Sequence, residues 1–347
     1  MQRESAPKRI PTSGVTLRDI YRARQCIAPI ARRTPLILSL ALSERAGTSV
    51  YLKLENLQET GSFKIRGAAN RMLHLSSDEK ARGVITVSTG NHGRAVAYVA
   101  GRLGIPAVVC MSERVPPGKV EAIRALGAEV VVGGQGYDEA EQRSVQLERE
   151  RGLVRIAPFD DPRVIAGQGT IGLELLEDLP EVDTAIVPLS GGGLISGIAR
   201  ALKSADRTIR VIGVSQDRAP VMVHSLRAGR PVELPEEETL ADALAGGIGL
   251  DNRYTFPMVR ELVDDTVLVT EEEIAAGIAF ALEQHRLVVE GGGAVGIAAL
   301  LQGRVSGSGR NVAVVVSGGN VGLPALRRVL EGHPIKEQDV GVPGQAP

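Results

Sequence analysis

Lys64 is the residue in this chain whose surroundings most clearly suggest covalent chemistry. It stands between Phe63 and Ile65 in a glycine-bounded turn, residues 61–67, soon after the strand-like run 50–54. Strand ends are where a scaffold presents functional groups. Apolar neighbours disfavour the charged form of an amine, so Lys64 is a candidate nucleophile and Schiff-base lysine. The alternative is an ordinary lysine at a helix start whose amine extends to solvent.

Two further turns follow strand-like runs and suit anions. Residues 88–93 offer hydroxyls, an amide and backbone N–H groups for a carboxylate, although a plain capping turn would use the same residues. Residues 190–194 hold three successive glycines that let the backbone approach a phosphate, although close strand-to-helix packing gives the same pattern. This second turn lacks a Walker ending and the full Gly-x-Gly-x-x-Gly spacing, which disfavours ATP and dinucleotides.

Three more segments are rich in glycine: residues 317–320, which follow the most apolar run, and the connectors 246–249 and 290–293. Glu290 follows an apolar run, so we expect it to be partly buried and to face a ligand, with a structural salt bridge as the alternative. One lysine with several anion-suited turns predicts a site for pyridoxal phosphate. This cofactor needs an amine, a phosphate cup, a partner for its ring nitrogen and a place for the substrate carboxylate.

Alternating strand-like and helix-like segments must position these turns. Short runs, mostly β-branched, lie at residues 84–87, 107–109, 129–132, 185–187, 211–214, 266–269 and 312–316. Continuous apolar runs of this length suit a parallel sheet that is covered on both faces. Helices are predicted between them at 120–126, 137–151 and 271–284, the last after a capping box formed by Thr270 and Glu273. The alternation predicts an α/β protein that is doubly wound.

Two domains are expected from this pattern. Residues 83–159 are expected to form a compact β-α-β-α-β-α-β series, which predicts a small inserted α/β domain. Residues 1–82 and 160–337 form the large cofactor-binding domain, and the Gly- and Pro-rich segment 338–347 is a flexible tail.

Composition excludes several classes of function. The formal net charge is −1 and aromatic residues make up 3% of the 347 residues, so we expect no nucleic-acid partner. Cys26 and Cys110 fit no zinc motif and the His residues form no His-x-x-x-His pair, so no metal site is expected. No run of 18 apolar residues and no signal peptide is indicated, so we expect a cytoplasmic protein that does not contact membranes.

Taken in order along the chain, residues 62–67, 88–93, 190–193 and 317–320 resemble the signature blocks of fold-type II pyridoxal-phosphate enzymes, most of all the threonine/serine dehydratase and serine racemase branch. The resemblance covers roughly residues 15–330. It implies a tryptophan-synthase-beta-like fold with two doubly wound open-sheet domains, a homodimer, and a small amino-acid substrate. The implied activity is α,β-elimination of water from a 3-hydroxy amino acid such as L-threonine or L-serine.

The resemblance also implies a role for each matching residue. Lys64 would be the Schiff-base lysine and the base at the substrate Cα. Asn91 would contact the ring hydroxyl of the cofactor, and Ser317 its ring nitrogen. The phosphate is expected at Ser190, Gly191, Gly192, Gly193 and Leu194, and the substrate carboxylate at Ser88, Thr89, Gly90 and His92. We expect Phe63, Glu290 and Gly318 to complete the cofactor site and Gly247 to line the substrate side-chain pocket.

Departures from the family pattern leave alternatives open. Thr89 stands where dehydratases often have Ala and where serine racemase has a Ser that acts on the opposite face of Cα, so Thr89 is counted as catalytic and racemisation stays open. Ser190 replaces the first of four glycines, and Ser215 replaces an acid that binds a cation in related enzymes. Residues 247–252 and 290–294 resemble dehydratases associated with hydroxyectoine utilisation, which makes a hydroxyectoine-derived substrate a further candidate. A non-catalytic protein that binds pyridoxal phosphate or amino acids is the remaining alternative.

Overall fold

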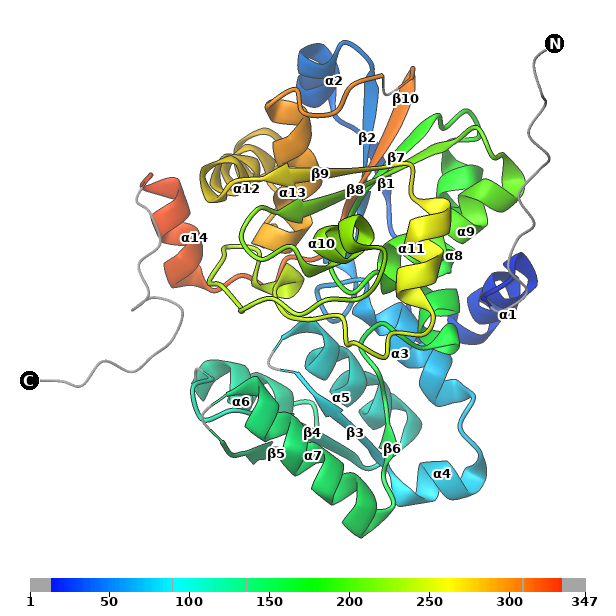
Figure 1. Cartoon of the computed structure of the whole chain (residues 1–347), viewed down its shortest axis with the longest axis vertical. Helices are drawn as coiled ribbons and strands as arrows, with labels where there is room; N and C mark the ends of the chain where they lie inside the picture. Colours follow the sequence, from blue (N-terminus) through cyan, green and yellow to red (C-terminus); the bar gives the residue numbers. More distant parts are fainter. Residues whose placement is uncertain (1–13, 89, 116, 135, 308, 333–347) are drawn as a thin grey trace, which may run out of the picture.

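The molecule has two α/β parts, each a sheet covered by helices, and they are called here the larger layer and the smaller layer (Figure 1). The computed structural model describes residues 14–332 except positions 89, 116, 135 and 308. The larger layer contains a sheet whose strands run in the order β1 (Leu36–Leu38), β2 (Ser49–Leu54), β10 (Asn311–Val316), β7 (Thr184–Pro188), β8 (Arg210–Gln216) and β9 (Asp265–Val269). β1 is antiparallel to β2, and the other pairs are parallel.

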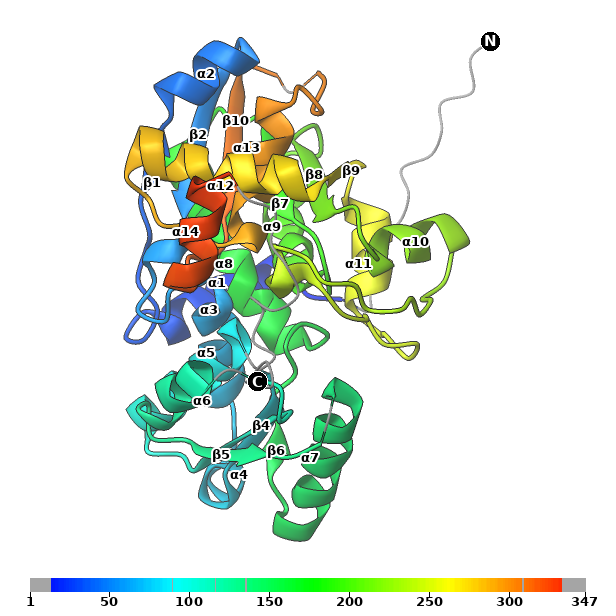
Figure 2. The ribbon, with the colours of Figure 1, turned by 90° about the vertical axis from the view of Figure 1, so that its left-hand side faces the viewer.

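The smaller layer contains a parallel sheet with strands in the order β5 (Glu129–Val132), β4 (Ala107–Met111), β3 (Val84–Val87) and β6 (Val154–Arg155). Helices lie on both faces of each sheet (Figure 2). They are α1 (Leu17–Ile27), α2 (Leu40–Ala46), α3 (Lys64–Leu73), α4 (Ser77–Arg82), α5 (Asn91–Leu103), α6 (Pro117–Arg124), α7 (Tyr137–Arg151), α8 (Pro162–Asp178), α9 (Gly193–Ala205), α10 (Val221–Ala228), α11 (Thr255–Leu262), α12 (Glu271–His285), α13 (Gly291–Leu301) and α14 (Leu323–Leu330), with short 3-10 turns η1 (Glu55–Leu57) and η2 (Asp242–Leu244).

The apolar runs bury both faces of the larger sheet, as parallel strands require. Along β10, Ala313 and Val315 pack into one core with α8, α9 and α11. The alternate residues Val312 and Val314 pack into a second core with α12 and α13. Each run predicted as a strand forms one, and each predicted helix forms within a few residues of its expected bounds. The doubly wound α/β prediction is therefore confirmed.

The capping box before α12 forms as expected, because Thr270 N donates to Glu273 Oε2 at 2.9 Å and Glu273 N donates to Thr270 Oγ1 at 3.3 Å. Residues 290–293 were expected to be a connector, and this is wrong: Glu290 is the N-cap of α13 and the glycines form its first turn. Their small size serves close packing, since a Cβ on Gly291 would lie 2.1 Å from the carbonyl oxygen of Leu240.

Strand β1 was not predicted, and β6 was expected as the last strand of the smaller series but without a stated range, because three and two residues are too few to show a period. The strands of the smaller sheet all lie within residues 84–155, and the domain boundaries at 83 and 159 stay a prediction. Residues 1–13 and the tail 338–347 lie outside the described residues. In the part of the chain that the structure describes, no helix combines the length and apolar character needed to cross a bilayer.

Candidate active site

Lys64 is the first residue of α3 and points to the junction of the two layers. Its Nζ donates a hydrogen bond to the carbonyl oxygen of Pro158 at 2.8 Å. Burial lowers the pKa of Lys64 to about 8, against the opposing negative charge of Glu290. A substantial share of the amine is therefore neutral near pH 8, which is the form that attacks an aldehyde.

Residues 317–319 lie beside the Lys64 turn. Because β2 and β10 are parallel neighbours with Leu54 opposite Val316, the turns that follow them meet at the same sheet edge. Phe63 N donates to the carbonyl oxygen of Ser317 at 3.0 Å, and Ser62 pairs with Gly318 in an isolated bridge. The sheet register thus places Ser317 next to the lysine turn.

Asn91, Glu290 and Asn320 form a chain of side-chain hydrogen bonds across the two layers. Asn91 Nδ2 donates to Glu290 Oε1 at 2.6 Å, and Asn320 Nδ2 donates to Asn91 Oδ1 at 2.6 Å. Burial raises the pKa of Glu290 to about 7, with a contribution from the charge of Asp242, while the hydrogen bond from Asn91 opposes the rise. This chain fixes the Asn91 amide at the helix start that follows β3.

The glycine turn before α9 forms a cradle that only glycine permits. Gly192 has φ +85°, and a Cβ on Gly191 would lie 2.3 Å from the ring of Phe159. The backbone N–H groups here belong to the N-terminus of α9, where the helix dipole favours an anion. Phe159 directly follows Pro158, the partner of Lys64, so the amine and the phosphate-suited turn lie against the same short segment.

Ser88 and His92, which are predicted to bind the substrate carboxylate, both make side-chain hydrogen bonds within the protein. His92 Nε2 lies 2.9 Å from the carbonyl oxygen of Ile156, and burial together with the charge of Lys64 lowers the pKa of His92 to about 3. The ring is therefore neutral and already bonded, which leaves the backbone N–H of His92 for a carboxylate. Ser88 Oγ accepts from Gly90 N at 3.3 Å, and a Cβ on Gly90 would meet open space. Thr89 lies outside the described residues.

Gly246 and Gly247 border open space, since a Cβ on either would meet no heavy atom closer than 4.0 Å. Among the hydrogen bonds of the described residues, none joins Gly247 to the Lys64 turn. Ser190 is half-buried and Leu194 is buried at the start of α9. The assignment of these residues to substrate or cofactor stays a prediction.

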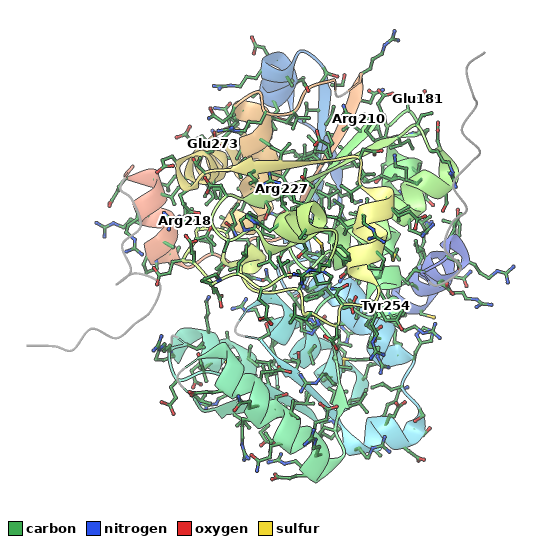
Figure 3. All side chains as sticks on the ribbon, in the orientation of Figure 1. Glu181, Arg210, Arg218, Arg227, Tyr254 and Glu273 are labelled. Carbon is green, nitrogen blue, oxygen red and sulfur yellow. The ribbon has the colours of Figure 1, made fainter. Side chains whose placement is uncertain are left out.

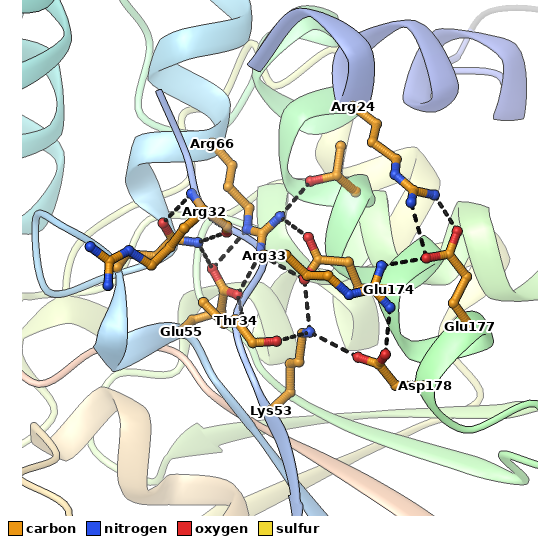
Figure 4. Close-up of polar contacts among 12 residues, drawn as sticks. Arg24, Arg32, Arg33, Thr34, Lys53, Glu55, Arg66, Glu174, Glu177 and Asp178 are labelled. Carbon is orange, nitrogen blue, oxygen red and sulfur yellow. Dashed lines mark hydrogen bonds and ion pairs between the residues drawn. The ribbon is translucent and has the colours of Figure 1, made fainter. Parts of the chain in front are cut away.

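Sequence reasoning missed a buried ionic cluster behind Lys64 (Figure 4). The Arg66 guanidinium donates to both oxygens of Glu55, at 2.7 and 2.8 Å, and to both oxygens of Glu174, at 2.6 and 2.9 Å. Lys53 Nζ lies 2.7 Å from Glu174, with its side chain fully buried. The cluster fastens the first turn of α3 to the end of β2 and to α8. The sequence signal for this cluster was Lys53, a lysine inside an apolar strand-like run, and this signal does not indicate which residues bind the lysine.

The arrangement fits pyridoxal phosphate. A buried amine with a lowered pKa lies close to a glycine cradle at a helix N-terminus. The hydroxyl of Ser62 is buried beside Lys64 and has no hydrogen-bond partner among the described residues. Within those residues, no group of three or more His, Cys, Asp or Glu side chains is arranged to hold a metal ion.

Comparison with known proteins gives matches over most of the chain. Residues 27–318 match the family described as "Pyridoxal-phosphate dependent enzyme". A putative threonine dehydratase of Sinorhizobium fredii is 51% identical over 320 residues, which are 92% of this chain and 96% of the relative. An L-threonine ammonia-lyase of Thermotoga maritima is 46% identical over 91% of this chain and 78% of the relative. The structure of maize serine racemase is similar with a TM-score of 0.86 and 37% identity, covering 92% of this chain and 98% of that one.

Proposed function

Since this chain belongs to the pyridoxal-phosphate dependent enzyme family and is a lyase of that family, we propose that it eliminates water from a 3-hydroxy amino acid such as L-threonine or L-serine. The observation that carries the proposal is the Lys64 amine, which has a pKa of about 8 and bonds to Pro158 beside the glycine cradle. Pyridoxal phosphate, when bound, supplies an electron-withdrawing ring that stabilises negative charge at the substrate Cα.

The residues of the chain divide the remaining work. Lys64 would hold the cofactor through its amine and would be the base that removes the Cα proton. Gly191 to Gly193 and the N-terminus of α9 hold the phosphate. The hydroxyl of Ser317, which donates to the carbonyl oxygen of Gly292 at 3.2 Å, would pair with the ring nitrogen of the cofactor. Because the hydroxyl is uncharged, it would not hold that nitrogen protonated, which would limit delocalisation into the ring and favour prompt loss of the β-hydroxyl.

The substrate carboxylate binds the backbone N–H groups at the start of α5, where the helix dipole adds attraction. Asn91 is held by Glu290 and would contact the ring hydroxyl of the cofactor. Lys64 takes the Cα proton and the β-hydroxyl leaves Cβ, so the substrate loses this proton and this hydroxyl as one molecule of water. The released enamine takes up water and yields a 2-oxo acid and ammonia.

Cofactor uptake and ammonia release test this function. Purified protein incubated with pyridoxal phosphate should gain a visible absorbance band, and Lys64→Ala should lose it. Lys80→Ala, in α4, removes an amine outside the site and should keep it. A panel of L-threonine, L-serine, bulkier 3-hydroxy amino acids and hydroxyectoine-derived compounds should release ammonia in at least one case. A wild-type protein that stays colourless with added cofactor contradicts the proposal.

Racemisation is the second candidate, favoured by the likeness to maize serine racemase and to a pyridoxal 5'-phosphate-dependent aspartate racemase, with a TM-score of 0.83 and 32% identity. Incubation with L-serine alone, following D-serine and pyruvate separately, distinguishes the two activities. If Thr89 acts on the opposite face of Cα, Thr89→Ala should abolish D-serine formation and spare pyruvate.

We also propose that the protein forms a homodimer. Figure 2 shows β1, α2 and α14 on one side of the larger layer, and each of these elements has one large apolar side chain that is exposed. These are Leu38, Leu40 and Leu323, exposed by 46%, 73% and 79%. Their burial against a second copy would remove apolar surface from water. Light scattering should give twice the chain mass, and Leu323→Asp should lower it, whereas Leu250→Asp at another exposed site should not.

A further inference from the structure

The segment 156–161, called here the crossover strap, leads from β6 of the smaller sheet to α8 of the larger layer. Consecutive residues of the strap contact different parts of the candidate active site. The carbonyl oxygen of Pro158 accepts from Lys64, and the ring of Phe159 lies where a Cβ on Gly191 would be. The strap therefore sets the lysine and the phosphate-suited turn relative to each other.

Asp160 extends these contacts to a third part of the molecule. Its Oδ1 accepts from Tyr254 N at 2.9 Å and from Thr255 N at 2.8 Å, and its Oδ2 accepts from Arg253 N at 2.8 Å. Thr255 is the first residue of α11, so a carboxylate from a distant part of the chain satisfies the free N–H groups of this helix start. Hydrogen bonds from backbone N–H groups to a charged carboxylate are stronger than those between neutral groups.

Hydrogen bonds of Asn252 connect the start of α11, which Asp160 binds, to the glycine-rich segment 246–252. Asn252 Nδ2 donates to the carbonyl oxygen of Ile248 at 3.0 Å and to Thr255 Oγ1 at 2.8 Å. Gly246 has φ +92° and a Cβ there would meet nothing within 4 Å, whereas Ile248 is buried in the core that includes α11. The position of the segment therefore depends on the packing of Ile248 and on the end that Asp160 binds.

We propose that Asp160 is a positioning residue that places segment 246–255 relative to Lys64 and so determines how the substrate side chain is held. The proposal rests on the proposed function, in which Gly247 lines the side-chain pocket. Figure 3 shows Tyr254 on the side of the larger layer that faces the smaller one, with Arg210 toward the opposite end. Asp160 thus acts at the junction where the site lies, through backbone groups and not through contact with the substrate.

Asp160→Ala and Asp160→Asn test this role in the cofactor-loaded enzyme. The alanine variant loses all three hydrogen bonds, and we expect kcat/KM for L-threonine to fall about 10- to 100-fold, because misplacement by about 1 Å costs that much. We expect the loss to lie mostly in KM and the ratio of kcat/KM for threonine over serine to change. The asparagine variant keeps one accepting oxygen for Tyr254 and Thr255, so its values should be intermediate.

Hydrogen exchange gives a readout that does not depend on activity. Backbone amides in 246–255 should exchange at least several-fold faster in Asp160→Ala than in wild type, with cofactor bound in both. Asp183→Ala is the matched control, because Asp183 also accepts from two backbone groups, Arg310 N at 2.7 Å and Asn311 N at 2.9 Å. These contacts lie where β7 and β10 begin, at the end of the larger sheet opposite to the Lys64 turn. It should lower the melting temperature without changing the threonine-to-serine ratio.

An unchanged ratio together with unchanged exchange in 246–255 overturns the proposal, even if Asp160→Ala lowers the melting temperature. If the alanine variant does not fold, the same two measurements on Asp160→Asn decide. Failure of the wild type to release ammonia from any compound overturns the proposed function instead. The exchange comparison then still decides whether Asp160 positions the segment.

Discussion

Helix α8 spaces the two parts of the site, and Gly167→Ala should change that spacing. α8 lies between α3, which begins at Lys64, and α9, whose N-terminus suits the phosphate. A Cβ on Gly167 would lie 2.5 Å from the carbonyl oxygen of Arg66 and 2.8 Å from Gly67 Cα. Both are backbone atoms, so no side chain can turn aside to make room.

The size of the effect follows from these distances. Normal contact between non-bonded heavy atoms is at about 3.5 Å or more, so α3 must move from α8 by roughly 1 Å. Overpacking of this kind costs about 1–3 kcal/mol of the free energy of unfolding. A displacement of about 1 Å at Lys64 should lower kcat/KM up to about 100-fold. The affinity for pyridoxal phosphate should fall as well, because the distance between Lys64 and the phosphate-suited turn would no longer match the length of the cofactor.

Titration of the apoprotein with pyridoxal phosphate, followed by absorbance, measures that affinity, and urea unfolding measures the stability. Gly118→Ala in α6 is the matched control, because a Cβ there would meet nothing within 4 Å. Its stability should stay equal or rise by up to about 1 kcal/mol, since Ala favours helix more than Gly. Wild-type cofactor affinity and wild-type kcat/KM in Gly167→Ala would refute the idea that α8 sets the spacing.

Three other changes test the electrostatics of the site. Arg66→Met leaves the buried carboxylate of Glu174 without its guanidinium, so urea unfolding should show that the free energy of unfolding falls by about 3–5 kcal/mol. Arg66→Lys should lower it by less. Equal stability of the wild type and both variants would contradict the role of the cluster. His92 has its pKa lowered to about 3, so the unfolded chain binds more protons between that pH and about 6.5 and stability falls on acidification through this window. His92→Gln should flatten that slope in melting temperatures measured against pH, and an unchanged slope would point to another group. Glu290→Gln removes the charge that raises the pKa of Lys64, so the apoprotein should take up pyridoxal phosphate faster at pH 7 in stopped-flow absorbance, and a slower uptake would count against this coupling.

The sequence by itself determined the elements and the turns that carry the chemistry. Strands, turns and helix starts depend on neighbouring residues, namely the apolar runs, the glycines and the capping residues. The turns at Lys64, 190–193 and 317–320 could therefore be assigned to strand ends from the sequence. Parallel strands bring such ends to one edge, and the structure places the Lys64 turn beside Ser317. The roles of the individual residues stay predictions for the variants above.

Only the tertiary structure decided which distant residues complete the site. Pro158 is 94 positions from Lys64, Asp160 is 93 to 95 positions from the N–H groups it accepts, and Arg66 is 108 from Glu174. No local pattern records such pairs, because they depend on the order of strands in the sheets and on how closely the helices pack. The first turn of α13 was mistaken for a connector for the same reason. Its glycines are needed because the backbone at Leu240, far away in the sequence, passes too close for any side chain.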